Sequence, residues 1–120
     1  ASAGIVLIGA DPPSMAITFG TVGSPDQDLR LVSIFPHMHE LGVSYDMRIR
    51  HSDGSQTCLV QGSYDFNNQL TYQFPSPISF ARGDELKFSC TWDNSGGDES
   101  VRYGERTDEE MCYFFVTVGR

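Results

Sequence analysis

Short runs of alternating apolar and polar residues, each ended by turn-forming residues, constrain the fold of this chain more than any other feature. Val43–His51 and Glu85–Trp92 both alternate residue by residue, as half-buried strands do. The Asp-Gly pair inside Ser52–Ser55 predicts a hairpin turn directly after the first of these strands. No segment of ten or more residues keeps a helical period, so helices are not expected.

The whole pattern predicts an all-β chain of about eight or nine strands. Strands at this spacing form an antiparallel β-sandwich or a jelly roll. Pro36 favours an edge position or a local bend, and Pro75-Ser76-Pro77 is expected to break a strand. The predicted strands are Ile5–Ile8, Met15–Phe19, Leu29–His39, Val43–His51, Gln56–Val60, Tyr64–Phe74 (with irregular pieces), Ile78–Phe80, Glu85–Trp92 and Met111–Val118.

Length and charge limit the classes of function. A chain of 120 residues has the size of one domain, so residues 1–120 are expected to form one jelly-roll domain. The formal net charge of −8 argues against nucleic acid or an anionic membrane as a partner. No stretch approaches the ~20 apolar residues of a membrane span. The first ten residues lack the basic start of a signal peptide, so we expect a mature or excised domain.

A His-x-His pair is the strongest candidate for a functional site. His37 and His39 lie in Pro36-His37-Met38-His39-Glu40-Leu41-Gly42, and on a strand this spacing turns both imidazoles to one face. Two neighbouring imidazoles form half of a transition-metal site. The thioether of Met111 could complete it, and a soft sulfur ligand favours copper, particularly Cu(I).

Plainer interpretations of these residues stay open. Two histidines can simply be polar residues on a solvent-facing strand, and a methionine fills a core more often than it binds a metal. His51 lies beside the hairpin turn, so it is expected to be an exposed strand-end residue and a poor third ligand. The acidic side chains of Glu40, Asp108, Glu109 and Glu110 are expected to be surface charges, although carboxylates would favour harder metals.

Two other kinds of metal site fit the sequence less well. Cupins are metal-binding jelly rolls with a glutamate four or more residues after the second histidine. Here Ser44 stands at plus four and no glutamate occurs between Leu41 and Asp53, so the cupin motif lacks its third ligand. A structural zinc site is disfavoured because such sites use four cysteine or histidine ligands rather than methionine.

The cysteine count is odd. Cys58, Cys90 and Cys112 allow one disulfide and one free thiol, and the sequence alone permits three pairings.

Three motifs in order resemble the second, catalytic-copper domain of the copper type II, ascorbate-dependent monooxygenases, the family of the peptidylglycine and dopamine β-monooxygenases. The first is the His-x-His-x-x-Gly stretch that ends at Gly42. The second is Gly83-Asp84 followed by Cys90-Thr91-Trp92-Asp93-Asn94-Ser95. The third runs from Gly104 through Thr107 to Glu110-Met111-Cys112, and the likeness covers about residue 28 to the end.

The resemblance implies one copper held by His37, His39 and Met111, where dioxygen binds and hydrogen is abstracted. It also implies a Cys90–Cys112 disulfide, worth about 3 kcal/mol in the loop-entropy model, and leaves Cys58 as an expected free, buried thiol. A disulfide indicates an oxidising compartment, so a secreted or periplasmic location is expected.

The chain also departs from that family. Family members carry an upstream electron-donating domain with three histidines, whereas one histidine is left over here. A further disulfide usual in the second domain lacks its cysteines. In the peptide-hydroxylating branch an arginine, an asparagine and a tyrosine help to bind the substrate carboxylate. Phe35, Tyr113 and Phe115 stand at those positions here, which disfavours peptide amidation and predicts a more aromatic, apolar pocket.

Two functional hypotheses follow. In the first, the chain is the copper domain of a monooxygenase-like protein. It binds dioxygen to hydroxylate a C–H bond of a small apolar or aromatic substrate, with electrons from ascorbate or a separate electron-donor copper domain. In the second, it is a non-catalytic secreted module for copper binding or protein interaction.

Overall fold

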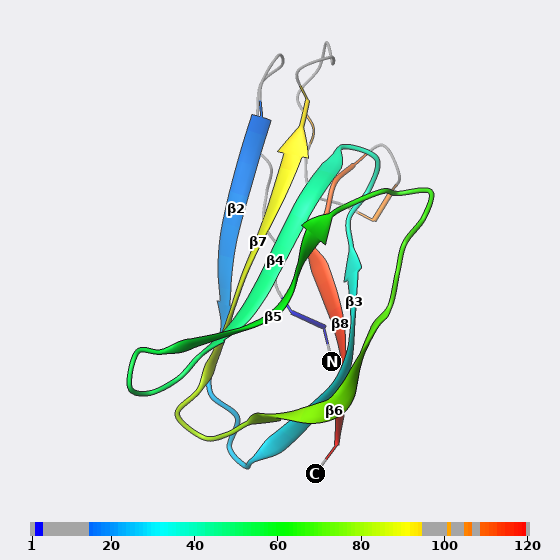
Figure 1. The fold of residues 1–120 in the computed structure, drawn as a ribbon. Coiled ribbons are helices and arrows are strands. Elements are labelled where there is room, and N and C mark those ends of the chain that lie inside the picture. Colours follow the sequence, from blue (N-terminus) through cyan, green and yellow to red (C-terminus); the bar gives the residue numbers. More distant parts are fainter. Residues whose placement is uncertain (1, 4–14, 95–100, 102–104, 107–108, 120) are drawn as a thin grey trace.

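Eight strands in two antiparallel sheets form the chain, which is seen here in a computed structural model describing residues 2–3, 15–94, 101, 105–106 and 109–119 (Figure 1). The predicted all-β sandwich is therefore confirmed. The predicted strand Ile5–Ile8 lies outside the described residues. The strands are β1 (Ser2–Ala3), β2 (Met15–Val22), β3 (Leu29–His37), β4 (Gly42–Arg50), β5 (Gln56–Ser63), β6 (Tyr72–Phe80), β7 (Glu85–Asp93) and β8 (Tyr113–Gly119).

The strands pair in a nested order. One sheet has the order β1-β8-β3-β6 and the other β2-β7-β4-β5, and all pairs are antiparallel. Strand β1 pairs with β8, β2 with β7, β3 with β6, and β4 with β5. This is the order expected for the jelly-roll form of a sandwich. No helix among the described residues is long and apolar enough to cross a membrane.

The core lies between the two sheets and is built from alternate residues of each strand. Strand β7 shows this most clearly, since Leu86, Phe88, Cys90 and Trp92 are all buried while their neighbours are partly exposed. The hydroxyls of Tyr45 on β4 and Tyr72 on β6 hydrogen-bond across the core and so join the two sheets. The other buried side chains of this core are Leu31, Ile34, Met38, Met47, Ile49, Leu59, Val60, Phe80, Cys112, Phe114 and Val116.

The predicted hairpin turn is present between β4 and β5. The His51 carbonyl accepts a hydrogen bond from the Gly54 amide at 2.9 Å, and Gly54 has a φ of 89° that glycine adopts without strain. The Asp53 carboxylate accepts hydrogen bonds from the Ser55 backbone and hydroxyl, which closes the tip.

The expected strand break at Pro75-Ser76-Pro77 was wrong, because β6 runs through it. Strand β6 is an edge strand that pairs only with β3, and the register jumps between Gln73 and Ile78. The prolines fall in this unpaired stretch, where their missing N–H groups break no ladder bond. Pro36 likewise lies beyond the pairing with β6, so β3 is locally an edge there, as predicted.

Two β-bulges change which residues face the core. A register shift at Val32 in β3 puts Leu31 and Ile34 inside, so that Phe35 and His37 lie on the opposite face from the core. A second shift in β5 buries both Leu59 and Val60. Cys58 is consequently an exposed free thiol, which corrects the expectation that it is buried.

Candidate metal centre

The His-x-His pair lies at the end of strand β3. His37 is the last residue of that strand and His39 follows outside it, so the predicted strand to residue 39 ends two residues early. The imidazole rings still lie together, with centroids 5.2 Å apart and planes at 81°. His37 is partly exposed, whereas His39 is buried.

Each imidazole is held through its Nδ1 atom. His39 Nδ1 lies 2.8 Å from the Glu109 carbonyl oxygen, which can only accept, so Nδ1 carries the proton and donates it. His37 Nδ1 lies 2.7 Å from the Gln69 Oε1 atom, and the Gln69 amide nitrogen donates to the Phe66 carbonyl at 3.0 Å. This second bond fixes the orientation of the amide. In the neutral form of each imidazole the proton therefore lies on Nδ1 and Nε2 is free to bind a metal.

Glu110 ties the two parts of the candidate site together and was not predicted to do so. Its carboxylate is buried, not at the surface, and accepts hydrogen bonds from the His39 and Leu41 amides at 2.9 and 2.8 Å. The oxygen that binds the His39 amide also receives a 3.4 Å contact from the Met111 amide. Burial raises the pKa of the Glu110 carboxyl, against the lowering effect of these backbone amides. The only sequence signal was a carboxylate beside a motif methionine.

Met111 is positioned by covalent and hydrogen bonds on both sides. It is buried and follows Glu110 directly, and Cys112 after it forms a disulfide with Cys90 on β7. This is the pairing that the family resemblance implies, and it joins the two sheets next to the methionine.

The turn after the histidines is also tightly packed. The Tyr64 hydroxyl donates a 2.6 Å hydrogen bond to the Met38 carbonyl between the two histidines. Burial raises the pKa of Tyr64 to about 12, so this hydroxyl keeps its proton at neutral pH. A Cβ atom at Gly42 would come within 2.7 Å of the Tyr64 ring and 2.9 Å of Met38, so the close approach requires glycine.

Aromatic rings lie near both histidines. Phe35 and Phe115 are register partners on β3 and β8, and their rings lie 6.2 and 6.3 Å from that of His37. Tyr113 is the register partner of His37 and stacks near Phe115 at 6.0 Å. Phe66 lies edge-on to His39 at 6.1 Å. Phe115 is 48% exposed, so an apolar aromatic surface borders the site.

The other candidate ligands are hydrogen-bonded to other side chains, exposed, or outside the described residues. His51 bridges the Asp84 carboxylate at 3.1 Å and the Thr57 hydroxyl at 2.8 Å, so it is not a solvent-facing strand end as expected. Glu40 is exposed, and Asp108 lies outside the described residues. Across the described part of the chain, no three His, Cys, Asp or Glu side chains gather closely enough to hold a metal.

Comparisons with known proteins agree on the family. A family model described as copper type II ascorbate-dependent monooxygenase, C-terminal domain, matches residues 2–118. The human putative DBH-like monooxygenase protein 2 is 30% identical over 96 residues, which is 78% of this chain and 19% of that protein. The mouse DBH-like monooxygenase protein 2 is 32% identical over 95 residues, which is 78% of this chain and 15% of that protein. The chain spans less than a fifth of either relative.

A solved structure adds little to this picture. The family 32 carbohydrate-binding module of C. perfringens NanJ, in complex with galactose, superposes with a TM-score of 0.34 at 14% identity, covering 81% of this chain and 93% of that one. The assignment rests instead on the family match across nearly the whole chain. This chain belongs to the copper type II ascorbate-dependent monooxygenase family, in the part that corresponds to its C-terminal domain.

Proposed function

We propose that this chain holds one copper ion through the Nε2 atoms of His37 and His39 and the thioether of Met111. The observation that carries the proposal is the state of the two imidazoles. Both Nδ1 atoms face oxygen acceptors, so in the neutral rings Nε2 is the atom that can bind a metal. Two imidazoles and a thioether form a donor set suited to copper, particularly Cu(I).

The protein's contribution is to position these three groups. The Glu109 carbonyl and Gln69 orient the imidazoles, and such outer partners commonly change metal affinity 10–100-fold. Glu110 fixes the backbone on both sides, and the disulfide anchors the residue after Met111. Copper, when bound, would supply redox chemistry and an open position for a small molecule such as dioxygen.

We further propose that the parent protein hydroxylates a C–H bond of an apolar or aromatic small molecule. The rings of Phe35, Tyr113 and Phe115 offer such a substrate apolar contact and no cation for a carboxylate. Electrons would come from ascorbate or from a separate electron-donor copper domain. The buried Cys90–Cys112 disulfide supports a secreted or periplasmic location for this chemistry.

A non-catalytic copper-binding or protein-interaction module is the second candidate. The third histidine of the chain is held by Asp84 and Thr57, which leaves it poorly placed to serve a second copper site. Copper binding without turnover would fit such a module.

The experiment is X-ray absorption of the chain loaded with Cu(I), followed by oxygen consumption with ascorbate. We expect nitrogen and sulfur neighbours around copper, with the sulfur lost in Met111→Leu and kept in Met47→Leu, a buried methionine of the core. A sulfur shell that survives Met111→Leu would refute the ligand set. Copper binding without ascorbate-driven oxygen consumption, even with an added donor domain, would favour the non-catalytic candidate.

A further inference from the structure

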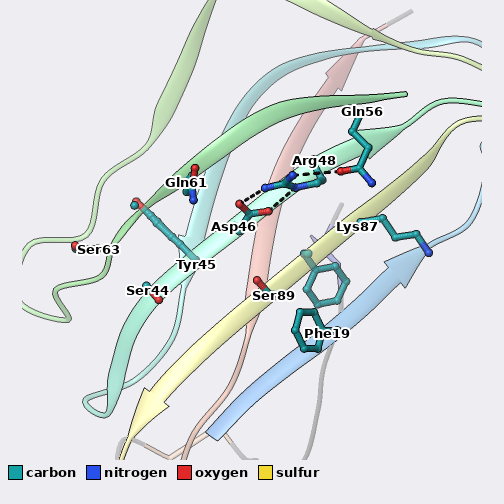
Figure 2. Close-up of a pocket in the computed structure, with 12 residues that line it drawn as sticks. Phe19, Ser44, Tyr45, Asp46, Arg48, Gln56, Gln61, Ser63, Lys87 and Ser89 are labelled. Atoms are coloured by element: carbon teal, nitrogen blue, oxygen red, sulfur yellow. Dashed lines mark hydrogen bonds and ion pairs between the residues drawn. The ribbon is translucent and has the colours of Figure 1, made fainter. Parts of the chain in front are cut away.

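A hollow of about 660 Å³, lined by both polar and apolar residues, lies on the outer face of the β2-β7-β4-β5 sheet, the sheet that does not carry the two histidines (Figure 2). This volume lies within the range of small-ligand sites. The strand register puts one residue from each of the four strands into a single row across the hollow. In strand order across the sheet, the row is Phe19, Ser89, Asp46 and Gln61.

A fixed ion pair lies at the centre of this hollow. Arg48 donates two hydrogen bonds to the Asp46 carboxylate, from Nε at 2.8 Å and from Nη2 at 2.6 Å. A third bond, from Nη1 to the Gln56 Oε1 atom at 3.2 Å, extends the network to strand β5 (Figure 2). The planar pair is locally neutral and held in one orientation, so it offers hydrogen-bonding groups without a net charge.

Four further polar residues, Ser44, Gln61, Ser63 and Ser89, line the hollow. Among the described residues, no side-chain hydrogen bond engages any of them. Each of these groups can both donate and accept. Several such groups converging on one hollow suit a ligand that itself carries many hydroxyls.

An exposed aromatic ring completes the surface. Phe19 is 74% exposed and lies at the β2 end of the row, beside Ser89 in the register (Figure 2). An exposed phenyl ring offers a flat apolar face, and a pyranose ring has a matching face of C–H groups. Phe19 can therefore stack against a sugar whose hydroxyls reach the polar residues of β4, β5 and β7.

The charges and the polarity of the face disfavour other classes of ligand. The chain carries a net charge of −8, which opposes an acidic polymer. Ile17 and Phe19 are large exposed apolar side chains of β2, and the residues that continue the row across the hollow, Ser89, Asp46 and Gln61, are polar. We propose that this face binds a neutral oligosaccharide, with Phe19 as the stacking platform and the Asp46–Arg48 pair and Gln61 as hydrogen-bonding groups. Copper has no part in this binding.

The test is a titration of the isotope-labelled, copper-free chain with cellohexaose, chitohexaose and mannohexaose, followed by amide NMR spectra. We expect at least one of these sugars to shift amides of β2, β4, β5 and β7. Phe19→Ala should lower its affinity about tenfold. Val118→Ala is the control, because it shortens an exposed apolar side chain on the other sheet and should leave the affinity unchanged.

Since Phe19 is largely exposed, its replacement should not prevent folding, and the spectra report this directly. Gln61→Ala should also weaken binding with the fold intact. The proposal is overturned if none of the three sugars shifts amides of this sheet. Equal binding by the wild type and the Phe19→Ala chain would overturn it as well.

Discussion

Replacing Glu110 by glutamine tests whether a buried carboxylate holds the two halves of the candidate metal centre together. Glutamine keeps the size of the side chain but replaces one acceptor oxygen with an N–H donor. One of the two short bonds to the His39 and Leu41 amides must then be lost. Leaving one of these buried amides without an acceptor costs about 1–3 kcal/mol, so we expect a loss of about 2 kcal/mol in unfolding free energy near pH 5. In a domain of this size that lowers Tm by roughly 6–10 °C.

The pH dependence supplies a second, independent check. Burial raises the pKa of Glu110 in the folded chain above its unfolded value. The protonated Glu110 therefore gives the wild type extra stability that is fully present below the pKa of the unfolded chain. This stability is lost as the pH rises through the pKa of the folded chain. Glutamine does not titrate, so the difference in stability between the two chains should narrow from pH 5 towards pH 8.

The assay is urea unfolding of the metal-free chains across this pH range. Glu109→Gln is the matched control, because the backbone carbonyl of Glu109, which binds His39, is kept. A Glu110→Gln chain as stable as the wild type at every pH would refute the reasoning. A difference that widens with pH would refute the assigned direction of the pKa shift.

Three further changes probe the supports of the site. Joint replacement of Cys90 and Cys112 by alanine should cost about 3 kcal/mol in unfolding free energy and weaken copper binding, measured by urea unfolding and metal titration. Gln69→Leu removes the acceptor of one imidazole and should weaken Cu(I) binding 10–100-fold with little change in Tm, whereas unchanged affinity would contradict its orienting role. Gly42→Ala should destabilise the chain by roughly 1–3 kcal/mol, and Gly23→Ala, with open space around it, should not; equal effects on thermal unfolding would argue against the close packing.

The strand pattern could be predicted because burial on one face leaves a period of two in the sequence. Val43–His51 and Glu85–Trp92 became β4 and β7 with little change at their ends. The bulges were not predictable, because an extra residue in a strand leaves no separate mark in the sequence. The bulge in β5 decided that Cys58 is exposed.

The candidate ligands and the disulfide could be named from motifs, but the groups that hold them could not. His39 binds the carbonyl of a residue 70 positions away, and any residue type can supply a carbonyl. Gln69 lies in a segment that was expected to contain strand, yet its role depends on how the chain folds back towards His37. Glu110 was expected at the surface because carboxylates usually are, and its two backbone partners exist only in the folded chain.

Competition titration with Cu(I) tests the central claim most directly. The wild type should bind one copper per chain. His39→Ala and Met111→Leu should each weaken binding by more than the roughly 10–100-fold that loss of an outer partner costs. His51→Ala and Met47→Leu should leave it unchanged, since these residues lie outside the proposed ligand set. Copper that binds equally to all five chains would contradict the site and leave an all-β domain without its proposed metal.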